Sequence, residues 1–410
     1  MDTNKVIVVG GGPAGIMAAG IAARRGKKVL LLEKNDRLGK KLLISGKGRC
    51  NITNDTDIEG LIQNTPGNGS FLYSSFYSFS NFDLVNFFSE LGLETKVERG
   101  GRVFPVSDSA KDVVAVLLSF LKDSGVEIRT GSAVKEIMSE DSRVTGVKLS
   151  DGEVILADSV ILAVGGMSYP GTGSTGDGYE MARRLGHTVM PLKPSLVPLI
   201  TKEEWVGDLQ GLSLKNISVT FSNSKGKEIY SDFGEMLFTH FGVSGPVILS
   251  ASRHLLSYDF KDIKLSIDLK PALSEEKLDE RVQRDFDKYS RKQFKNSLDE
   301  LLPQKLIPVV IELSKIDQFK PVHQITREER KRIVGLLKHF ELTVHAARPI
   351  KEAIVTAGGI KTNEINPSTM ESKKTGGLYF AGEIIDVDAY TGGFNLTIAF
   401  STGHLAGMSC

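Results

Sequence analysis

A glycine-rich turn near the start of the chain carries the clearest chemical signal. The apolar run Val6–Val9 leads into Gly10-Gly11-Gly12-Pro13-Ala14-Gly15, which opens an alanine-rich stretch. A second apolar run, Val29–Leu32, then ends at the acid Glu33. This order predicts a strand, a tight turn, a helix and a second strand that ends in a carboxylate, which is the context in which a GxGxxG motif is specific.

Each residue type in this segment suits the binding of a dinucleotide. Gly10 permits the tight turn, Gly12 lets a pyrophosphate approach the backbone, and Gly15 lets the helix pack closely on the strand. The free N–H groups of the first helical turn, which begins at Pro13 and Ala14, face the phosphates. Glu33 stands where an acid accepts hydrogen bonds from a ribose. An ordinary glycine-rich turn is the alternative, and the motif alone does not distinguish FAD from NAD.

A second constellation lies near the other end of the chain. The apolar run Leu378–Ala381 stops at Gly382 and Glu383, and Thr391-Gly392-Gly393-Phe394-Asn395 then opens an apolar helix over Leu396–Ala406. A glycine pair that opens a helix creates an anion site, because the N–H groups of the first turn are unsatisfied. In flavoproteins such a segment covers the ribityl phosphate and directs the helix N-terminus at the flavin ring. A plain strand–turn–helix that only closes the fold is the alternative, but the pairing with the first fingerprint favours FAD.

The segment Val160–Gly166 resembles the strand and turn that precede a second glycine motif in glutathione-reductase-like flavoproteins. Gly165 and Gly166 are expected to lie beside the cofactor. The stretch Gly171–Gly176 formally matches GxGxxG, but several residues, Pro170 among them, separate it from the strand. We therefore expect no separate NAD(P)H domain, and any pyridine nucleotide would bind transiently near the flavin.

A basic loop follows Glu33 and includes Lys34, Lys40 and the run Gly46-Lys47-Gly48-Arg49-Cys50-Asn51. Glycines that flank basic residues suit a loop pressed against a phosphate or a ring. Arg49 could offer a planar set of donors to a phosphate or a substrate carboxylate. Cys50 allows a redox role, but a small buried residue beside the cofactor is the favoured interpretation, because no partner cysteine is near in sequence.

His240 is the other candidate for catalysis, as a proton donor from an inserted domain. A structural histidine is an equally good interpretation. The remaining histidines show no metal-ligand spacing, so we expect no metal. No GxSxG or comparable nucleophile motif is present.

Composition restricts the class of protein. The 410 residues predict two or three domains, and 40% hydrophobic with 25% charged residues is typical of a soluble globular protein. The formal net charge of +1 provides no overall attraction to nucleic acid or to an anionic membrane. The two cysteines form no CxxC motif, which argues against a dithiol relay and is consistent with a reducing cytoplasm.

One stretch could be mistaken for a membrane span. Val6–Ala23 contains no charge, but three glycines and Pro13 interrupt it. A buried strand followed by a buried helix explains it better. We expect a cytoplasmic protein without a membrane partner, and the sequence leaves monomer and homo-oligomer open.

The elements that would position these sites follow from periodicity. Helices are expected over residues 81–92, 108–124 and 177–185, with Ser107 or Asp108 as a cap. Strands are expected over residues 126–130, 144–149, 154–156 and 159–164, the last three as an antiparallel meander. Residues 34–54 are expected to be a loop.

The pattern of expected strands, helices and glycine-rich turns along the chain predicts its domains. Residues 1–190 and 350–410 form the two parts of an FAD-binding domain, and residues 191–270 form an inserted β-barrel with a return strand near 341–348. Residues 271–340 form a helical subdomain with Thr326–Glu329 as a capping box. The fold class is therefore α/β, a Rossmann domain with inserted β-barrel and helical parts.

The motifs together resemble a known family. They occur in the order typical of that family, from about residue 5 to residue 407. These motifs are the fingerprint, Leu38–Lys41, Gly48–Asn54, Pro66–Gly69, Gly101–Pro105, Thr172–Gly178, Leu237–Pro246 and Ala381–Asn395. This family is the bacterial family of FAD-dependent flavoproteins that includes aminoacetone oxidases and flavoproteins assigned to bile-acid reduction. The resemblance implies a glutathione-reductase-like domain that binds FAD tightly and non-covalently. The chain departs from the family at Lys47, where the middle of three glycines is usual, which weakens inference about the substrate.

The residues expected to bind the cofactor come from the motifs and from this resemblance. The resemblance alone adds Val134, and it supplies no shared catalytic base. The full set is Gly10, Gly12, Pro13, Ala14, Gly15, Glu33, Lys34, Lys40, Gly48, Arg49, Cys50, Asn51, Val134, Gly165, Gly166, Gly382, Glu383, Gly393, Phe394 and Asn395.

Four functions are compatible with the sequence. The first is oxidation of a small amine or amino-ketone by hydride transfer to flavin N5, with oxygen as acceptor and hydrogen peroxide as product. The second is an NAD(P)H-dependent flavin reductase of enones or other small acceptors. An RNA-associated flavoprotein is the third, and the low net charge argues against it. The fourth is a non-catalytic FAD-binding scaffold.

Overall fold

The computed structural model describes residues 4–410, and the chain divides into two compact units. The first unit comprises the chain up to Ser195 together with Ile350–Cys410, and the second comprises Leu196–Pro349. The expected α/β class with a Rossmann domain is confirmed, because the first unit is built on a parallel sheet and the second contains a closed barrel.

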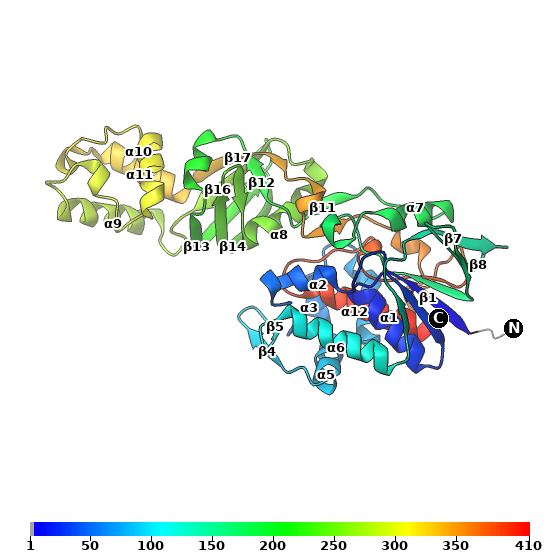
Figure 1. Ribbon diagram of the computed structural model, residues 1–410. Coiled ribbons are helices and arrows are strands. Elements are labelled where there is room, and N and C mark those ends of the chain that lie inside the picture. The colour runs from blue at the N-terminus through cyan, green and yellow to red at the C-terminus, as the bar shows by residue number, and fades with distance from the viewer. Residues whose placement is uncertain (1–3) are drawn as a thin grey trace. The chain divides into compact units, whose positions relative to one another are not determined.

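The first unit is organised around a five-stranded sheet in which every neighbouring pair is parallel (Figure 1). Four of its strands are mainly apolar and buried, as expected for parallel strands covered on both faces, whereas the edge strand over residues 127–129 is polar and more exposed. In spatial order they are β19 (Leu378–Phe380), β10 (Ser159–Leu162), β1 (Lys5–Val9), β2 (Lys28–Leu32) and β6 (Glu127–Arg129).

Helix α1 (Pro13–Arg24) packs between α12 (Phe394–Ser409) and α6 (Ala110–Asp123). Small residues allow α1 and α12 to approach closely. A Cβ atom added at Gly403 would lie 2.3 Å from the Ala14 carbonyl oxygen. The first and last helices of the chain therefore form one packed pair beside the sheet. The unit's other helices are α2 (Lys40–Ile44), α3 (Ile58–Gln63), α4 (Tyr73–Ser78), α5 (Asn81–Glu90) and α7 (Asp177–Arg184).

Smaller sheets complete this unit, and one of them corrects the expected meander. The antiparallel meander consists of β7 (Val134–Glu140), β8 (Arg143–Leu149) and β9 (Val154–Leu156). The run 159–164 was wrongly assigned to it, because β10 instead pairs in parallel with β1 and β19. Its uninterrupted apolar residues suit a strand that is buried on both faces.

Two further expectations about local structure were wrong. Residues 34–54 are not only loop, since they contain α2 and a 3₁₀ segment, Ser45–Gly48. Helix α6 has Ser109 at its N-cap position without a side-chain cap, and neither Ser107 nor Asp108 caps it. The Asp108 carboxylate instead pairs with Arg49 and Lys96. The remaining sheets contain β3 (Thr53–Asn54), β5 (Arg102–Pro105) and β4 (Thr95–Glu98), and β11 (Lys193–Ser195) with β18 (Val355–Ala357).

The second unit contains a closed six-stranded antiparallel barrel, with helix α8 (Pro246–His254) packed on β14. The last strand of the barrel, β17, follows the helical region in sequence and pairs with β12 and β16. In order around the barrel the strands are β12 (Leu199–Thr201), β15 (Gly242–Ser244), β14 (Glu228–Thr239), β13 (Ser213–Ser222), β16 (Ile263–Asp268) and β17 (Phe340–Ala347).

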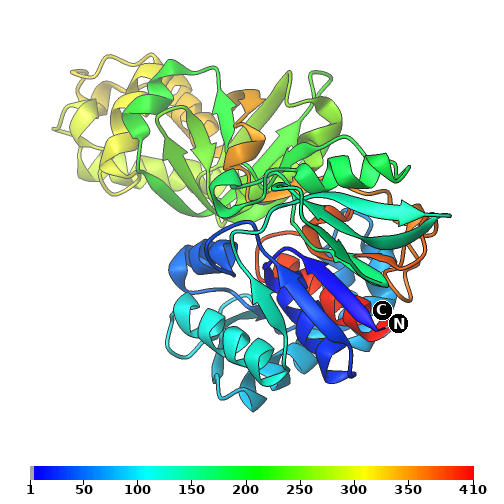
Figure 2. The ribbon, with the colours of Figure 1, turned by 45° about the vertical axis from the view of Figure 1, so that its right-hand side comes forward.

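Three helices gather at one end of this barrel (Figure 2), and they are α9 (Glu275–Lys288), α10 (Ile307–Ser314) and α11 (Arg327–Lys338). The capping box at the start of α11 is present. Thr326 accepts a hydrogen bond from the Glu329 N–H, and Glu329 accepts one from the Thr326 N–H. The helical segment expected over 271–340 therefore lies between β16 and β17.

Within residues 4–410, no helix is both long enough and apolar enough to cross a membrane. The uncharged run Val6–Ala23 is divided between β1 and α1. The same residues contain no group of three or more histidine, cysteine, aspartate or glutamate side chains arranged to hold a metal ion.

Candidate functional site

The turn between β1 and α1 has the geometry that its glycines predicted. Gly10 has a φ of +105°, and a Cβ atom there would lie 2.5 Å from the Ala163 carbonyl oxygen. A Cβ atom at Gly15 would lie 1.9 Å from the Gly10 carbonyl oxygen, whereas one at Gly12 would meet no atom within 4 Å. Two of the glycines are therefore required by packing. The third leaves open space at the N-terminus of α1, where no side chain caps the helix.

Glu33 is held rigidly at the end of β2. Its Oε2 accepts a 2.7 Å hydrogen bond from the Gly11 N–H, and its Oε1 accepts bonds from the Asn35 N–H at 2.8 Å and Asn35 Nδ2 at 2.7 Å. The side chain is buried beside the glycine turn. A carboxylate fixed in this way can accept hydrogen bonds from the hydroxyl groups of a ribose without losing its own orientation.

The segment that matches a second GxGxxG lies over the first one. Lys34 donates hydrogen bonds to Thr175 Oγ1 at 2.6 Å and to Asp177 Oδ2 at 2.8 Å, and Asn35 Nδ2 donates to the Thr172 carbonyl at 3.1 Å. These bonds tie residues 172–177 to the end of β2. The segment lines the same cavity as Gly10–Ala14 and opens no second nucleotide fold in the described residues.

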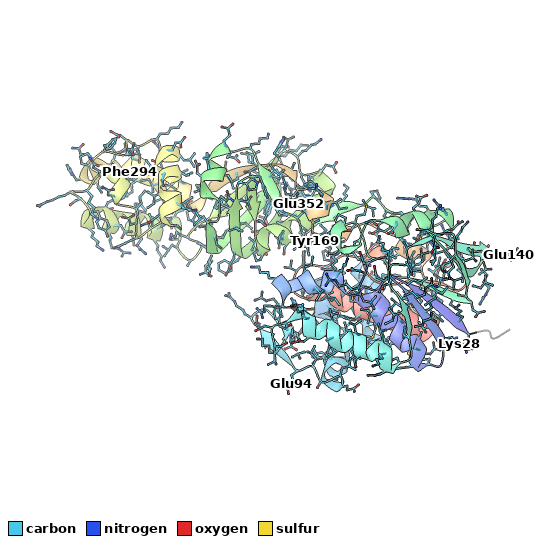
Figure 3. The ribbon with its side chains drawn as sticks, in the orientation of Figure 1. Lys28, Glu94, Glu140, Tyr169, Phe294 and Glu352 are labelled. Atoms are coloured by element: carbon cyan, nitrogen blue, oxygen red, sulfur yellow. The ribbon has the colours of Figure 1, made fainter. Side chains whose placement is uncertain are left out.

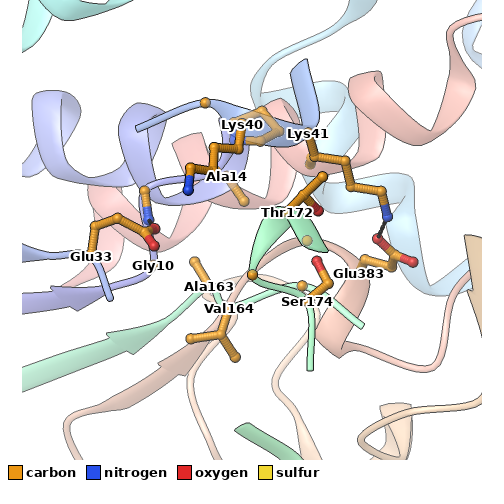
Figure 4. A pocket seen from close by; sticks show the side chains of 18 of the residues that line it. Gly10, Ala14, Glu33, Lys40, Lys41, Ala163, Val164, Thr172, Ser174 and Glu383 are labelled. Carbon is orange, nitrogen blue, oxygen red and sulfur yellow. Dashed lines mark hydrogen bonds and ion pairs between the residues drawn. The ribbon is translucent and has the colours of Figure 1, made fainter. Parts of the chain in front are cut away.

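The C-terminal constellation closes the other side of the cavity through a network around Glu383. Lys41 Nζ lies 2.6 Å from Glu383 Oε2 and donates to Ser168 Oγ at 2.8 Å. Ser168 Oγ and the Thr356 N–H each donate to Glu383 Oε1 at 2.9 Å. Figure 4 shows Glu33 and the Lys41–Glu383 pair at opposite sides of the cavity.

Helix α12 begins at this cavity with free amide groups. Gly393, its N-cap residue, has a φ of +104° and provides no capping side chain. The Asn395 side chain turns back to the preceding loop, where its Nδ2 donates to the Ala389 and Tyr390 carbonyls and its Oδ1 accepts from the Ala389 N–H. The Leu396 N–H donates to the Gly393 carbonyl at 3.1 Å, whereas the N–H groups of Phe394 and Asn395 have no acceptor among the described residues and remain available to one on a bound molecule.

The cavity encloses about 1340 Å³ that no protein atom fills, including its open mouth. Twelve of the twenty residues expected to bind the cofactor line it. They are Gly10, Gly12, Pro13, Ala14, Glu33, Lys34, Lys40, Val134, Gly165, Gly382, Glu383 and Asn395.

The other eight lie outside the lining, and they are Gly15, Gly48, Arg49, Cys50, Asn51, Gly166, Gly393 and Phe394. Several of them shape it indirectly. Gly15 packs against Gly10, and a Cβ atom at Gly393 would lie 2.2 Å from the Thr53 carbonyl oxygen. A Cβ atom at Gly166 would lie 2.5 Å from Thr356 Oγ1. These glycines therefore allow neighbouring segments of the chain to lie closer to the backbone than a side chain would permit.

The guanidinium of Arg49 is engaged elsewhere. It lies 2.5 Å from Glu98 Oε1 and 2.8 Å from Asp108 Oδ1, and it stacks over the Phe104 ring at 4.0 Å. Hydrogen bonds from Arg49 to Glu98 and Asp108 raise the pKa of the guanidinium above its usual value. These contacts fasten the Arg49 loop to β4 and β5, and a contact of Arg49 with a phosphate or substrate stays a prediction.

Cys50 and Lys47 occupy strained positions in the same loop. Cys50 is fully buried with a φ of +61°, and burial raises the pKa of its thiol to about 11. The thiol is therefore protonated at neutral pH, which favours the non-redox interpretation. Lys47 is exposed with a φ of +59°, a conformation that explains why a glycine is usual at this position.

His240 lies in the turn between β14 and β15 of the second unit and packs edge-on against Phe241, with ring centroids 4.9 Å apart. Its expected role as a proton donor stays a prediction.

Sequence reasoning missed part of the lining. Lys41 follows the predicted Lys40 directly, but only the tertiary fold brings it to Glu383. Thr172, Gly173 and Ser174 also line the cavity, but the sequence did not assign them to the cofactor site, because they belong to the second glycine motif. The signal that could have identified them is that they lie in a motif shared with the resembled family. Ile354 and Val355 line the cavity as well, and no sequence motif marks them as cofactor-binding residues.

The described residues fit FAD. Two uncapped helix N-termini, those of α1 and α12, border one cavity, and a buried acid lies at one side while the Lys41–Glu383 pair lies at the other. The open space above Gly12 suits a pyrophosphate. The fold and this cavity define an FAD-dependent oxidoreductase of the Rossmann type.

Comparisons with known proteins identify the family. The model of the HI0933-like protein Rossmann domain matches residues 4–409, and the chain belongs to this family. It is 35% identical to the 3-dehydro-bile acid delta(4,6)-reductase of Clostridium scindens, over 98% of both chains. It is 31% identical to the ribosomal RNA dihydrouridine synthase of Haemophilus influenzae, over 98% of this chain and 97% of the relative.

Among solved structures, the 3-ketosteroid-delta4-(5alpha)-dehydrogenase of Rhodococcus jostii RHA1 has a similar fold. The alignment covers 100% of this chain and 97% of the dehydrogenase chain, with a TM-score of 0.53 and 15% sequence identity. FAD is the cofactor of this chain, as the sequence predicted.

Proposed function

We propose that this protein is a flavin-dependent reductase that adds hydrogen across a carbon–carbon double bond conjugated to a carbonyl group. The observation that carries the proposal is that two relatives matching nearly the whole chain are named for this one type of reaction. A delta(4,6)-reductase saturates a ring double bond, and dihydrouridine differs from uridine by two hydrogens across the C5–C6 bond beside a carbonyl. The two substrates differ in size, but the chemistry is common to both.

FAD, when bound, supplies hydride transfer between a donor and an acceptor carbon. Glu33 would hold its ribose, and the first turn of α1 would hold its pyrophosphate. The free N–H groups at the start of α12 favour negative charge that develops on a group bound beside them.

The source of electrons follows from the single dinucleotide turn. Because residues 172–177 lie over the first glycine motif, the described residues provide no second Rossmann fold for NAD(P)H. The donor and the acceptor therefore use the flavin in turn. Overall, NAD(P)H and a proton convert the conjugated double bond to a single bond and release NAD(P)⁺. This scheme requires ping-pong kinetics.

The test is an anaerobic assay of the purified holoenzyme with NADH or NADPH and either 2-cyclohexen-1-one or uridine. We expect oxidation of the nucleotide that depends on the acceptor, and a product heavier by two hydrogen atoms. Double-reciprocal plots at several acceptor concentrations should be parallel.

The outcome that overturns the proposal is the absence of anaerobic NAD(P)H oxidation together with peroxide formation from small amines in air. That result would support the amine oxidase that the sequence also allows. Bound flavin that no donor reduces would support the non-catalytic scaffold.

A further inference from the structure

The helical region of the second unit carries a basic run that the proposed chemistry does not use. Residues 288–295 read Lys-Tyr-Ser-Arg-Lys-Gln-Phe-Lys, with four cations, two aromatic residues and no acid. The run begins at Lys288, the last residue of α9, and ends within the 3₁₀ segment Phe294–Asn296. Phe294, which lies in the helical region (Figure 3), has a fully buried side chain that fixes the run to the core of this region.

A second loop holds this run in place. The Phe294 N–H donates to the Lys320 carbonyl at 2.9 Å, and the Lys295 N–H donates to the Gln318 carbonyl at 3.1 Å. On the other side, the Val322 N–H donates to the Lys292 carbonyl at 3.0 Å. The two loops form one surface, which we call the 288–320 surface, made of residues 288–295 and 315–320.

The cations of this surface are not neutralised by acids. Arg291 and Lys292 are exposed, Lys295 is partly exposed, and none of the three has an ion-pair partner within residues 4–410. Lys288 and Lys320 are the exceptions, because Lys288 pairs with Glu300 at 2.7 Å and Lys320 pairs with Glu329 at 2.8 Å. Three positive charges therefore face solvent within five residues.

Aromatic rings lie among these cations. Lys292 Nζ lies 4.2 Å from the centroid of the Tyr289 ring, and Lys295 Nζ lies 4.5 Å from that of Phe319. Phe319 is 53% exposed, although it is a large apolar side chain. Exposed rings beside unpaired cations suit a partner that offers both phosphates and flat bases.

We propose that the 288–320 surface binds single-stranded RNA that carries the uracil to be reduced. The inference rests on the proposed function, since uracil is a cyclic conjugated carbonyl compound and one relative is named for its reduction in ribosomal RNA. Arg291, Lys292 and Lys295 contact phosphates, and Phe319 stacks on a base. The net charge of +1 is an average over the chain and does not describe this surface.

The first test measures binding of a fluorescein-labelled 20-nucleotide uridine-rich RNA to the holoenzyme by anisotropy, as a function of salt. The triple variant Arg291→Glu, Lys292→Glu, Lys295→Glu should bind at least about tenfold more weakly, and its salt slope should fall by roughly 2. The matched control is Lys215→Glu, Lys225→Glu, Lys227→Glu, which removes three exposed lysines of the same unit. This control should bind nearly as the wild type.

The second test isolates stacking. Phe319→Ala should weaken binding about tenfold while leaving the salt slope unchanged. Phe233→Ala, at another exposed phenylalanine of the second unit, should have no effect.

The inference is overturned if the wild type does not bind the RNA, or if the triple variant binds it as tightly as the wild type. Binding of phosphatidylglycerol vesicles in place of RNA would also contradict it. Reduction of 2-cyclohexen-1-one should persist in every variant. If the wild type reduces neither 2-cyclohexen-1-one nor uridine, the proposed function fails, and this outcome is distinct from loss of RNA binding.

Discussion

The Lys41 ammonium lies 2.6 Å from the Glu383 carboxylate, although 342 positions separate the two residues in the chain. Both side chains are largely buried, with exposed fractions of 29% and 19%. Ser168 bonds to both partners. The pair therefore joins the N-terminal and C-terminal segments at the side of the cavity away from Glu33, and it fixes the geometry in which a long dinucleotide is enclosed.

This pair should be energetically coupled. Lys41→Met and Glu383→Gln should each lower the free energy of unfolding, and a double-mutant cycle by urea denaturation should give a coupling of about 1–3 kcal/mol, because removal of one partner leaves the other uncompensated. The exposed pair Lys264–Glu341, at 4.0 Å, is the control and should show no measurable coupling. Additive effects at Lys41 and Glu383 would contradict the interpretation.

Glu33 should control retention of FAD. Glu33→Ala removes the acceptor for the ribose and releases the Gly11 and Asn35 N–H groups, so the dissociation constant of FAD should rise about tenfold to hundredfold. The measurement is fluorescence titration of the apoprotein with FAD. Glu94→Ala, at an exposed acid of the same unit, should leave affinity unchanged. Equal affinity of Glu33→Ala and wild type would contradict the placement of the ribose.

Much of this site could be predicted from the sequence because its chemistry is local. Gly10, Gly12 and Glu33 stand in a strand–turn–helix–strand order that dictates their geometry, and all three line the cavity. Lys41 could not be assigned to Glu383, since their contact depends on the packing of α1 against α12 and on the sheet order. Local pattern does not encode such pairings.

Arg49 shows how contacts between distant residues add to what a local pattern predicts. Its residue type suits a phosphate, but its neighbours in the fold, Glu98 and Asp108, lie far away in sequence and engage its guanidinium. Likewise, short turns between residues 144 and 164 indicated one meander, whereas the apolar run of β10 finds a more buried place beside β1. In both cases the arrangement depends on residues that are distant in sequence, which a local pattern does not encode.

Lys47 should be replaceable by glycine with a gain in stability. Its φ of +59° disfavours any side chain, and its side chain is exposed. Lys47→Gly should raise the free energy of unfolding by about 0.5–1 kcal/mol, after the larger chain entropy of glycine is subtracted. Thermal unfolding measures it, with Lys111→Gly in helix α6 as a control that should be destabilising. A loss of stability in Lys47→Gly would contradict the conformation described for this loop.

Glu364 should make the protein sensitive to acid. Burial alone would raise the pKa of this carboxyl, but hydrogen bonds from Lys374 and from the Thr188 backbone outweigh burial and lower the pKa to about 2. A lowered pKa stabilises the fold above the ordinary value of 4.5, and this contribution of about 3 kcal/mol is lost as the pH falls from 4.5 toward 2.

The variant Glu364→Gln tests this assignment. It should unfold at lower urea concentration than the wild type at pH 7, and the difference between the two proteins should shrink as the pH falls below 4.5. Glu140→Gln, at an exposed acid, should follow the wild type at each pH. A difference between Glu364→Gln and the wild type that does not change with pH would contradict the lowered pKa.

The central claim, that one FAD cavity serves the reduction of a conjugated double bond, is tested most directly by anaerobic double-mixing stopped flow. The enzyme is first reduced with NADPH and then mixed with 2-cyclohexen-1-one, with uridine-containing RNA or with air-saturated buffer, while flavin absorbance is followed. We expect NADPH to bleach the flavin rapidly, and at least one conjugated acceptor to reoxidise it faster than oxygen does. Reoxidation by oxygen alone, with neither acceptor able to restore the flavin absorbance, would contradict it.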